Sequence, residues 1–301
     1  MRLASIGAAL ALGLALVVGA GAQETPQEAN KKEALQRYNA GVGALNRGDL
    51  EYALYQFRQA VRLDPTAAEA QHNLGITLLR LRQPAEAAEA FRQALALQPD
   101  YVDAHVGLGL AYRARGDLQQ AAAEFCAAVV KRPDDVHIRL ELGDLYLNLK
   151  EPRLAAEHLA EAARLMPQDA SIQFKLGLAY TESNEMDAAV EAFRAATRVR
   201  PQDADAQYML NLALQKKMLL LMDERIEALR RMTDLRPSDA DAHYWLGMAY
   251  IEKARFNAVD EKRFLSKLAL DQFRLFQQLA PQDPRAPVAV HNIEALEHRV
   301  K

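Results

Sequence analysis

The feature that most constrains the fold of this chain is a 34-residue period that runs through most of its length. Prolines keep this step over five periods, as do glycines, a large apolar residue and two small residues. The five registers are Pro65, Pro99, Pro133, Pro167 and Pro201; Gly41, Gly75, Gly109, Gly143 and Gly177; Ala53, Ala87, Ala121, Ala155 and Ala189; Phe57, Phe91, Phe125, Leu159 and Phe193; and Ala60, Ala94, Ala128, Ala162 and Ala196. Five registers held in step predict a solenoid of stacked repeats.

Each repeat has the pattern of two helices joined by a short turn, as the segment 102–135 illustrates. Leu108 and Tyr112 share one face of a first helix because they are four residues apart. Gly116 supplies the turn, and Phe125 lies on the inner face of a second helix. Pro133 ends that helix, since its ring cannot sit in a helix interior. One such unit cannot cover its own apolar face, so the units must stack.

The composition supports an all-α fold. Hydrophobic residues make up 50% of the 301-residue chain. Ala and Leu, which are good helix formers, dominate this share. Residues that favour strands are too thinly spread to predict a sheet.

This pattern resembles the tetratricopeptide repeat family over residues 34 to 281. The resemblance implies an all-α, right-handed solenoid of helix-turn-helix repeats, with regular repeats at 34–67, 68–101, 102–135, 136–169 and 170–203. Besides the ladders above, it is carried by Leu74-Gly75, Leu108-Gly109-Tyr112, Leu142-Gly143-Tyr146, Leu176-Gly177-Tyr180 and Trp245-Leu246-Gly247 with Tyr250.

Two further repeats, at 204–239 and 240–281, depart from the pattern. In the sixth repeat Asn211 replaces the helix glycine, Arg225 replaces a small packing residue, and Pro237 comes two residues late. The seventh repeat has ten extra residues, near 253–267. We expect this insertion either to lengthen both helices or to form a protruding loop.

The two ends of the chain carry different signals. Residues 1–22 read as a signal peptide, with Arg2 before an apolar run and a small-x-small site that predicts cleavage after Ala22. An uncleaved membrane anchor is the alternative, because the run is just long enough to span a bilayer. Residues 23–33 are polar and predicted to be a disordered linker. Residues 284–301 are predicted to form a capping helix with Val290, Ile293, Leu296 and Val300 facing inward.

The resemblance also implies a partner site, because first helices line a concave groove in tetratricopeptide arrays. The residues that this assigns to the groove are Tyr38, Val42, Leu45, His72, Ile76, Leu79, Val106, Leu110, Arg113, Leu140, Asp144, Leu147, Phe174, Leu178, Thr181, Tyr208, Leu212, Gln215, Tyr244, Met248 and Ile251. Many are apolar or aromatic, so we expect the groove to take an amphipathic helix or an extended apolar peptide. Alternatively, some of them simply pack against neighbouring helices. The Lys and Asn clamp of the chaperone-binding subclass is absent, since Tyr38, Val42, His72 and Ile76 stand on the corresponding faces.

A second candidate contact site is the apolar run Met218, Leu219, Leu220, Leu221 and Met222. It falls where the turn of the sixth repeat is expected, a place that is usually polar. An exposed cluster of this kind marks a contact site. The alternative is burial by a helix pair that turns late.

No motif argues for catalysis, a cofactor or a metal. Gly107-Leu108-Gly109 lies mid-helix with no strand before it, unlike a phosphate-binding loop. His291, Glu294 and His298 share a helix face, but a solvated surface explains them better than a metal site. Cys126, the one cysteine, is interpreted as a small packing residue. The formal charge is −3 with no basic block, so nucleic acid is not an expected partner.

Together these observations predict a non-catalytic scaffold that binds a protein or peptide in the periplasm or envelope of a Gram-negative-type bacterium, or after secretion. A membrane-tethered assembly factor with an uncleaved signal is one alternative, and an enzyme or accessory subunit with an unrecognised site is the other. A homo-oligomer is possible, and any membrane contact would need the uncleaved signal.

Overall fold

The computed structural model describes residues 25–300, and the predicted signal peptide, 1–22, lies outside them. The described residues form fourteen helices and no strand, which confirms the all-α repeat solenoid. The helices are α1 (Pro26–Arg47), α2 (Leu50–Leu63), α3 (Ala68–Arg80), α4 (Pro84–Leu97), α5 (Val102–Arg115), α6 (Leu118–Lys131), α7 (Val136–Asn148), α8 (Pro152–Leu165), α9 (Ala170–Glu182), α10 (Met186–Val199), α11 (Ala204–Leu235), α12 (Ala240–Ala254), α13 (Val259–Leu279) and α14 (Ala286–Val300).

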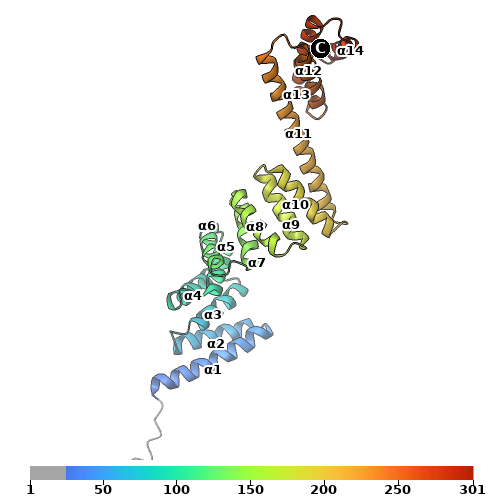
Figure 1. Cartoon of the computed structure of the whole chain (residues 1–301). Helices are drawn as coiled ribbons and strands as arrows, with labels where there is room; N and C mark the ends of the chain where they lie inside the picture. Colours follow the sequence, from blue (N-terminus) through green and yellow to red (C-terminus); the bar gives the residue numbers. More distant parts are fainter. Residues whose placement is uncertain (1–24, 301) are drawn as a thin grey trace, which may run out of the picture. The chain divides into compact units, whose positions relative to one another are not determined.

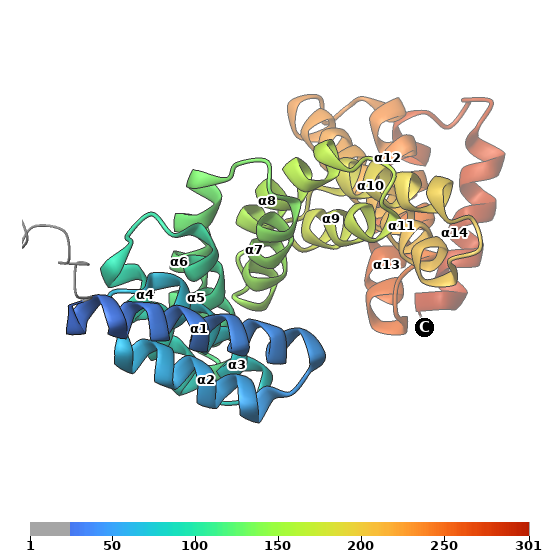
Figure 2. The same ribbon diagram turned by 90° about the horizontal axis from the view of Figure 1, so that it is seen from below.

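The chain divides into two compact units, Met1–Leu165 and Met166–Lys301, which we call the N-terminal and C-terminal parts. In the N-terminal part the helices pair as α1 with α2, α3 with α4, α5 with α6 and α7 with α8 (Figures 1 and 2). In the C-terminal part α9 pairs with α10, α12 with α13, and α13 with α14. No helix among residues 25–300 combines the length and apolar character needed to cross a membrane.

A residue in the left-handed backbone region separates the two helices of each of the first five repeats. These residues, again 34 apart, are Gly48, Arg82, Gly116, Lys150 and Asn184. This conformation is strained for residues other than glycine. It ends one helix and allows the next to begin within two residues. After Gly48 and Gly116 comes an aspartate, and Asp49 accepts a hydrogen bond from the N–H of Tyr52 at the start of α2.

The boundaries between repeats are set by aspartate caps and by proline. Asp135, Asp169, Asp203 and Asp239 each accept a backbone hydrogen bond at the N-terminus of a first helix. A side chain on that helix reaches back to the carbonyl of the preceding repeat's proline, as His105 does to Pro99 and His243 to Pro237. The recurring histidines at these two positions therefore serve helix termini.

Paired helices approach closely because glycine on the first meets a large ring on the second. A Cβ atom added to Gly75 would lie 2.8 Å from Cε1 of Phe91, and one added to Gly41 would lie 2.8 Å from Cε1 of Phe57. Both rings are fully buried. The same contact joins Gly177 to Phe193 in the C-terminal part. The period in the sequence is thus a period of close packing.

The predicted linker, 23–33, is corrected from residue 26 onward, because α1 begins at Pro26. Thr25 and Glu28 form a reciprocal capping box, with the Thr25 N–H donating to Glu28 Oε2 at 2.8 Å and the Glu28 N–H donating to Thr25 Oγ1 at 3.2 Å. Pro26 favours the first helical position. Local capping therefore extends the helix into a segment whose polarity alone suggested disorder.

The sixth repeat differs most from the prediction, because α11 is one continuous helix of 32 residues (Figure 1). The turn expected at Met218–Met222 does not form. Met218 stands 34 residues after Asn184, at the left-handed position, and Leu219 follows where other repeats have a polar residue. Leu, Met, Lys and Gln are strong helix formers, so nothing in 215–222 breaks the helix.

The insertion and the end of the chain are also helical. The insertion mainly lengthens α13 to 21 residues, whereas the second helices of repeats one to five have 14. The terminal helix forms as α14, but Val290 is exposed and Ala289 is buried in its place. The inward row of Ala289, Ile293 and Leu296 follows a spacing of four and three residues, which fits the helical period better.

Candidate ligand-binding groove

Most of the residues predicted to line the groove in the N-terminal part are half-buried. Val42 and Leu45 pack against the cluster around Phe57, and Ile76 and Leu79 pack against the cluster around Phe91. The remaining apolar members here, Val106, Leu110, Leu140 and Leu147, are half-buried in the same way. Each of these side chains thus packs against the core on one side and is exposed on the other.

Tyr38 shows how this row is held in place. Its ring lies 5.9 Å from that of Phe57, and its hydroxyl accepts a hydrogen bond of 2.9 Å from Nδ2 of Asn73 on α3. The ring is therefore fixed between two repeats. A fixed aromatic side chain loses little entropy when a ligand binds to it.

A pocket of about 230 Å³ opens beside Tyr38. Its apolar wall is formed by α1, by the end of α2 and by the start of α3. Leu35 lies at its mouth, with 59% of its surface exposed. The lining residues are Lys31, Ala34, Leu35, Tyr38, Ala60, Asp64, Ala67, Glu69 and Ala70. Pockets for drug-sized ligands usually exceed this volume, so it suits a single apolar side chain.

The polar residues of the row are mostly committed to neighbouring helices. His72 lies against two rings, with centroids 5.6 Å from Phe91 and 4.8 Å from Tyr101. Burial lowers the pKa of His72, so its imidazole is neutral at neutral pH. Arg113 forms an ion pair with Glu141 on α7. Asp144 is half-buried on the same helix. The pair of Arg113 and Glu141 joins the successive first helices α5 and α7.

In the C-terminal part, some of the residues predicted to line the groove are half-buried and others are exposed. Phe174 packs edge to face on Phe193, with ring centroids 5.7 Å apart, and Leu178 packs on the same cluster. Thr181 donates a hydrogen bond of 2.8 Å to the carbonyl of Gly177. Tyr208 is 65% exposed, while Leu212 beside it is half-buried and Gln215 is exposed. Of this group, Tyr208 is the more exposed of the two aromatic side chains, since Phe174 is half-buried.

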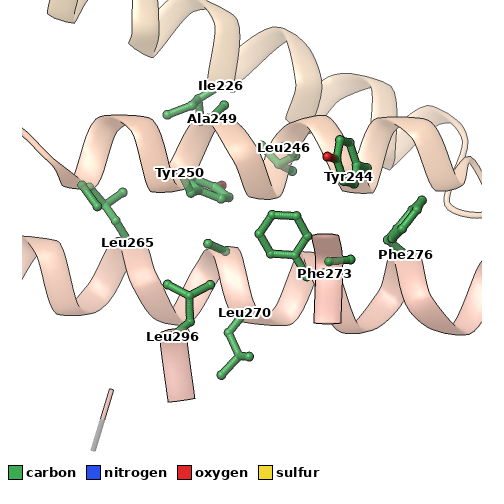
Figure 3. Packing of buried hydrophobic residues seen from close by; sticks show 13 residues of the cluster. Ile226, Tyr244, Leu246, Ala249, Tyr250, Leu265, Leu270, Phe273, Phe276 and Leu296 are labelled. Atoms are coloured by element: carbon green, nitrogen blue, oxygen red, sulfur yellow. The ribbon is translucent and has the colours of Figure 1, made fainter. Parts of the chain in front are cut away.

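The prediction for Tyr244 is corrected, because this ring belongs to the core. It is 6% exposed and lies 5.0 Å from the ring of Phe276 and 5.9 Å from that of Phe273 (Figure 3). Arg285 covers it, with its guanidinium carbon 4.9 Å from the ring centroid. Since α13 and α14 close over this end, Tyr244 has no free face for a partner.

Met248 and Ile251, on the same face of α12, are half-buried against this cluster. The sulfur of Met248 accepts a 3.7 Å hydrogen bond from Asn292 on α14. The terminal helix therefore takes part of the space that a partner would need here.

The apolar run at 218–222 is partly exposed on α11. Leu220 and Leu221 are exposed, while Met218, Leu219 and Met222 are half-buried. Neither burial by a late-turning pair nor an exposed loop describes this arrangement, because the run lies in the middle of one helix.

The sequence reasoning missed several exposed apolar residues, among them Leu35 and Phe264, which line hollows of the surface. Leu35 lies one turn before Tyr38 on the same face of α1, and this spacing could have identified it. Phe264 is exposed on the lengthened part of α13, beside a second hollow of about 720 Å³. That hollow lies between α11, α12 and α13, and its lining includes four acidic and three basic residues: Asp223, Glu224, Glu227, Glu261, Arg230, Arg231 and Lys253.

Candidate chemistry is sparse among residues 25–300. No group of three His, Cys, Asp or Glu side chains there is arranged to hold a metal ion, and His291, Glu294 and His298 are exposed on α14. Cys126 is half-buried and lies 3.4 Å from the hydroxyl of Tyr146. Gly107 and Gly109 lie in the interior of α5. The positions of Cys126, Gly107 and Gly109 match packing roles.

Stacked helical hairpins whose first helices carry a row of half-exposed apolar side chains define an α-solenoid. A family model described as "Tetratricopeptide repeat" matches residues 72–137, 140–204 and 174–214, and a second model, "TPR repeat", matches 45–81. Together they cover more than half of the chain, which therefore belongs to the tetratricopeptide repeat family.

Solved structures support the same fold. A crystal structure of MamA protein matches with a TM-score of 0.54 and 22% identity, over 58% of this chain and 95% of that one. MamA from Desulfovibrio magneticus RS-1, residues 41 to the end, matches with a TM-score of 0.52 and 24% identity, over 57% and 98%. Identities this low show the fold alone. The search of curated proteins gave no match.

Proposed function

We propose that this chain is a non-catalytic scaffold that binds a protein or peptide on the first-helix face of its N-terminal part. Membership in the tetratricopeptide repeat family supports a role in protein interaction. The observation that carries the proposal is the pocket beside Tyr38, with Leu35 exposed at its mouth. An aromatic ring held in place next to an apolar pocket is the kind of anchor site that partner recognition uses.

The chemistry of the pocket indicates what binds there. Its apolar wall takes one aliphatic or aromatic side chain of the ligand. Its rim has two carboxylates, Asp64 and Glu69, against one ammonium, Lys31. A basic residue next to the apolar anchor would complement this rim. The ligand is therefore an amphipathic helix or extended segment whose apolar anchor is flanked by a positive charge.

We also propose that the protein acts in the periplasm or cell envelope, or after secretion. The support is the signal-peptide pattern of residues 1–22. The mass of the mature N-terminus, measured on protein from fractionated cells, tests this. A chain that begins at Gln23 in the soluble periplasmic or secreted fraction fits the proposal. A membrane fraction that retains Met1 would replace it with the tethered alternative.

The binding proposal is tested by capture from the envelope fraction with the wild type, Leu35→Asp and Val130→Asp. Val130 is an exposed apolar residue on α6 outside the pocket, so its variant controls for the added charge. We expect one partner to be captured by the wild type and by Val130→Asp and lost with Leu35→Asp. Equal capture by all three would exclude the pocket, and no capture by any would argue against the scaffold.

The captured partner then provides the defined probe. A synthetic peptide from its contact segment should bind in calorimetry, and replacing its apolar anchor with Ala should weaken binding by about ten- to a hundredfold. Binding of the unaltered peptide should also weaken with salt, because the rim charges are exposed. Unchanged affinity after removal of the anchor would show that the pocket does not recognise it.

A further inference from the structure

The continuous helix α11 replaces both helices of the sixth repeat, so this repeat lacks the contact that paired helices make elsewhere. Elsewhere the first and second helices of a repeat pack face to face, as Gly177 does against Phe193. In the sixth repeat the equivalent residues, Asn211 and Leu229, are on the same straight helix. They are 18 residues apart, which is about 27 Å along the axis. The two halves of α11 therefore cannot pack on each other.

Each half of α11 keeps its other neighbour. Ala206 and Ala213 in the first half are buried, and this half packs on α10. Ile226 in the second half is buried in the cluster of α12 and α13. The contact inside the repeat is missing. Leu229, which would have made it, packs instead on the cluster of α12 and α13, and Arg225 pairs with Glu252 of α12.

Exposed and half-buried side chains of both halves nevertheless form one stripe along α11. The stripe, defined as Leu214, Met218, Leu221, Arg225, Ala228 and Met232, has alternating spacings of four and three residues. That spacing is the heptad pattern of helices that pair along their length. Leu221 is 54% exposed and Met232 is 44% exposed. A helix lying along the stripe would bury both side chains.

We propose that the stripe is covered by a second copy of this chain, with the two α11 helices antiparallel and crossing at Leu220–Leu221. In this arrangement the first half of one α11 meets the second half of the other, so each copy covers the exposed side chains of the other's stripe. The interface is the same patch on both copies, as two-fold symmetry requires.

Charge along the stripe supports this occupant. In an antiparallel pair, positions equally far from the crossing point face each other. Lys217 then lies opposite Glu224 of the second copy, and the symmetry forms this pair twice. Within one copy Lys217 pairs with the exposed Asp187 of α10, and a surface ion pair of this kind is weak enough to be exchanged. A parallel arrangement would place like charges together, which disfavours it.

The primary test compares the wild type with a variant in which the turn is restored. In Met218→Gly/Leu219→Asp, the sixth repeat acquires the Gly-Asp pair of Gly48-Asp49 and Gly116-Asp117, at the same place in the period. For chains that begin at Gln23, light scattering should show a wild-type dimer and a folded monomeric variant with unchanged helical circular dichroism. A wild type that stays monomeric at tens of micromolar, or a variant that dimerises equally well, would overturn the proposal.

A charge exchange tests the interface if the turn variant fails to fold. Lys217→Glu and Glu224→Lys should each weaken dimerisation about tenfold, because each disrupts two symmetric ion pairs. The double variant should restore it. Within one helix these residues are seven positions apart and about 10 Å from each other, so restoration must come from a contact between copies. Lack of restoration would contradict the proposed register.

Cross-linking tests the crossing point. In a Cys126→Ala background, Leu221→Cys should form a disulfide between copies on mild oxidation, since the two residues at position 221 are offset by only about 1.5 Å along the axis at the crossing. Lys216→Cys, on the opposite side of α11, is the matched control and should stay reduced. Equal cross-linking of both would indicate random collision and count against the interface.

Discussion

Gly107 on α5 lies directly against the ring of Phe91 on α4, in the preceding repeat. A Cβ atom on Gly107 would be 2.8 Å from Cδ1 of Phe91 and closer still to Cε1 and Cζ. Phe91 is fully buried and also touches Gly75 of its own repeat. One ring thus fills the space that glycines leave on two helices, and this contact joins one repeat to the next.

Gly107→Ala should destabilise the protein by about 1–2 kcal/mol. Overpacking against a buried ring costs about 1–3 kcal/mol, and the gain in helix propensity returns about 0.5–1 kcal/mol. Gly43→Ala is the control, because its Cβ would meet only Nη1 of Arg47, at 3.4 Å. That variant should be more stable than the wild type by about 0.5–1 kcal/mol. Urea unfolding measures both, and equal effects would contradict this account of Phe91.

Tyr244→Ala should destabilise the C-terminal part by about 3–4 kcal/mol, whereas Tyr208→Ala should change stability by less than about 0.5 kcal/mol. The first ring is buried among Phe273, Phe276 and Arg285, and removing it leaves a cavity. The second ring is largely exposed. Thermal unfolding of the two variants measures the difference. Similar melting temperatures would mean that Tyr244 is not a core residue.

The ion pair at the start of α14 predicts a dependence on acid pH. Hydrogen bonds from the Arg285 side chain and backbone hold the pKa of Asp283 at about 2, below its ordinary value of 3.8. The lowered pKa means that the stabilisation is present above pH 4 and is lost as the pH falls towards 2. The melting temperature of the wild type should therefore exceed that of Asp283→Asn at pH 5, and this difference should shrink by pH 2. A difference that stays constant over this range would show that the pair does not titrate.

The left-handed turn residues predict opposite effects in neighbouring repeats. Gly116→Ala should cost about 1 kcal/mol, because a Cβ is strained in this conformation. Lys150→Gly, at the same place in the next repeat, should stabilise by up to about 0.5 kcal/mol, since relief of strain slightly exceeds the entropy that glycine loses on folding. Chemical denaturation measures both. A loss of stability with Lys150→Gly would mean that its side chain contributes contacts that outweigh the strain.

The repeat ladders predicted the helical pairs well because each ladder marks a contact that must recur. Gly75, Phe91 and Pro99 define where two helices touch and where the second ends, and the structure has these features where the period places them. The capping aspartates Asp135 and Asp169 are also 34 residues apart, so the same argument could have predicted them. The groove assignment rests on the position of each residue in the repeat. Position alone does not distinguish half-buried Val106 from exposed Tyr208, which is at the same place in the period.

Spacing and local backbone preference were enough to define the all-α repeat class and the helical pairs of the first five repeats, but they placed a turn at Met218–Met222 that does not form. The consequences of that missing turn came from the tertiary structure alone. In it α11 runs straight, α13 and α14 cover Tyr244, and Leu221 and Met232 remain exposed along one stripe. The difference arises because exposure depends on which helix covers a face, and a local period cannot specify a neighbour that the chain fails to supply.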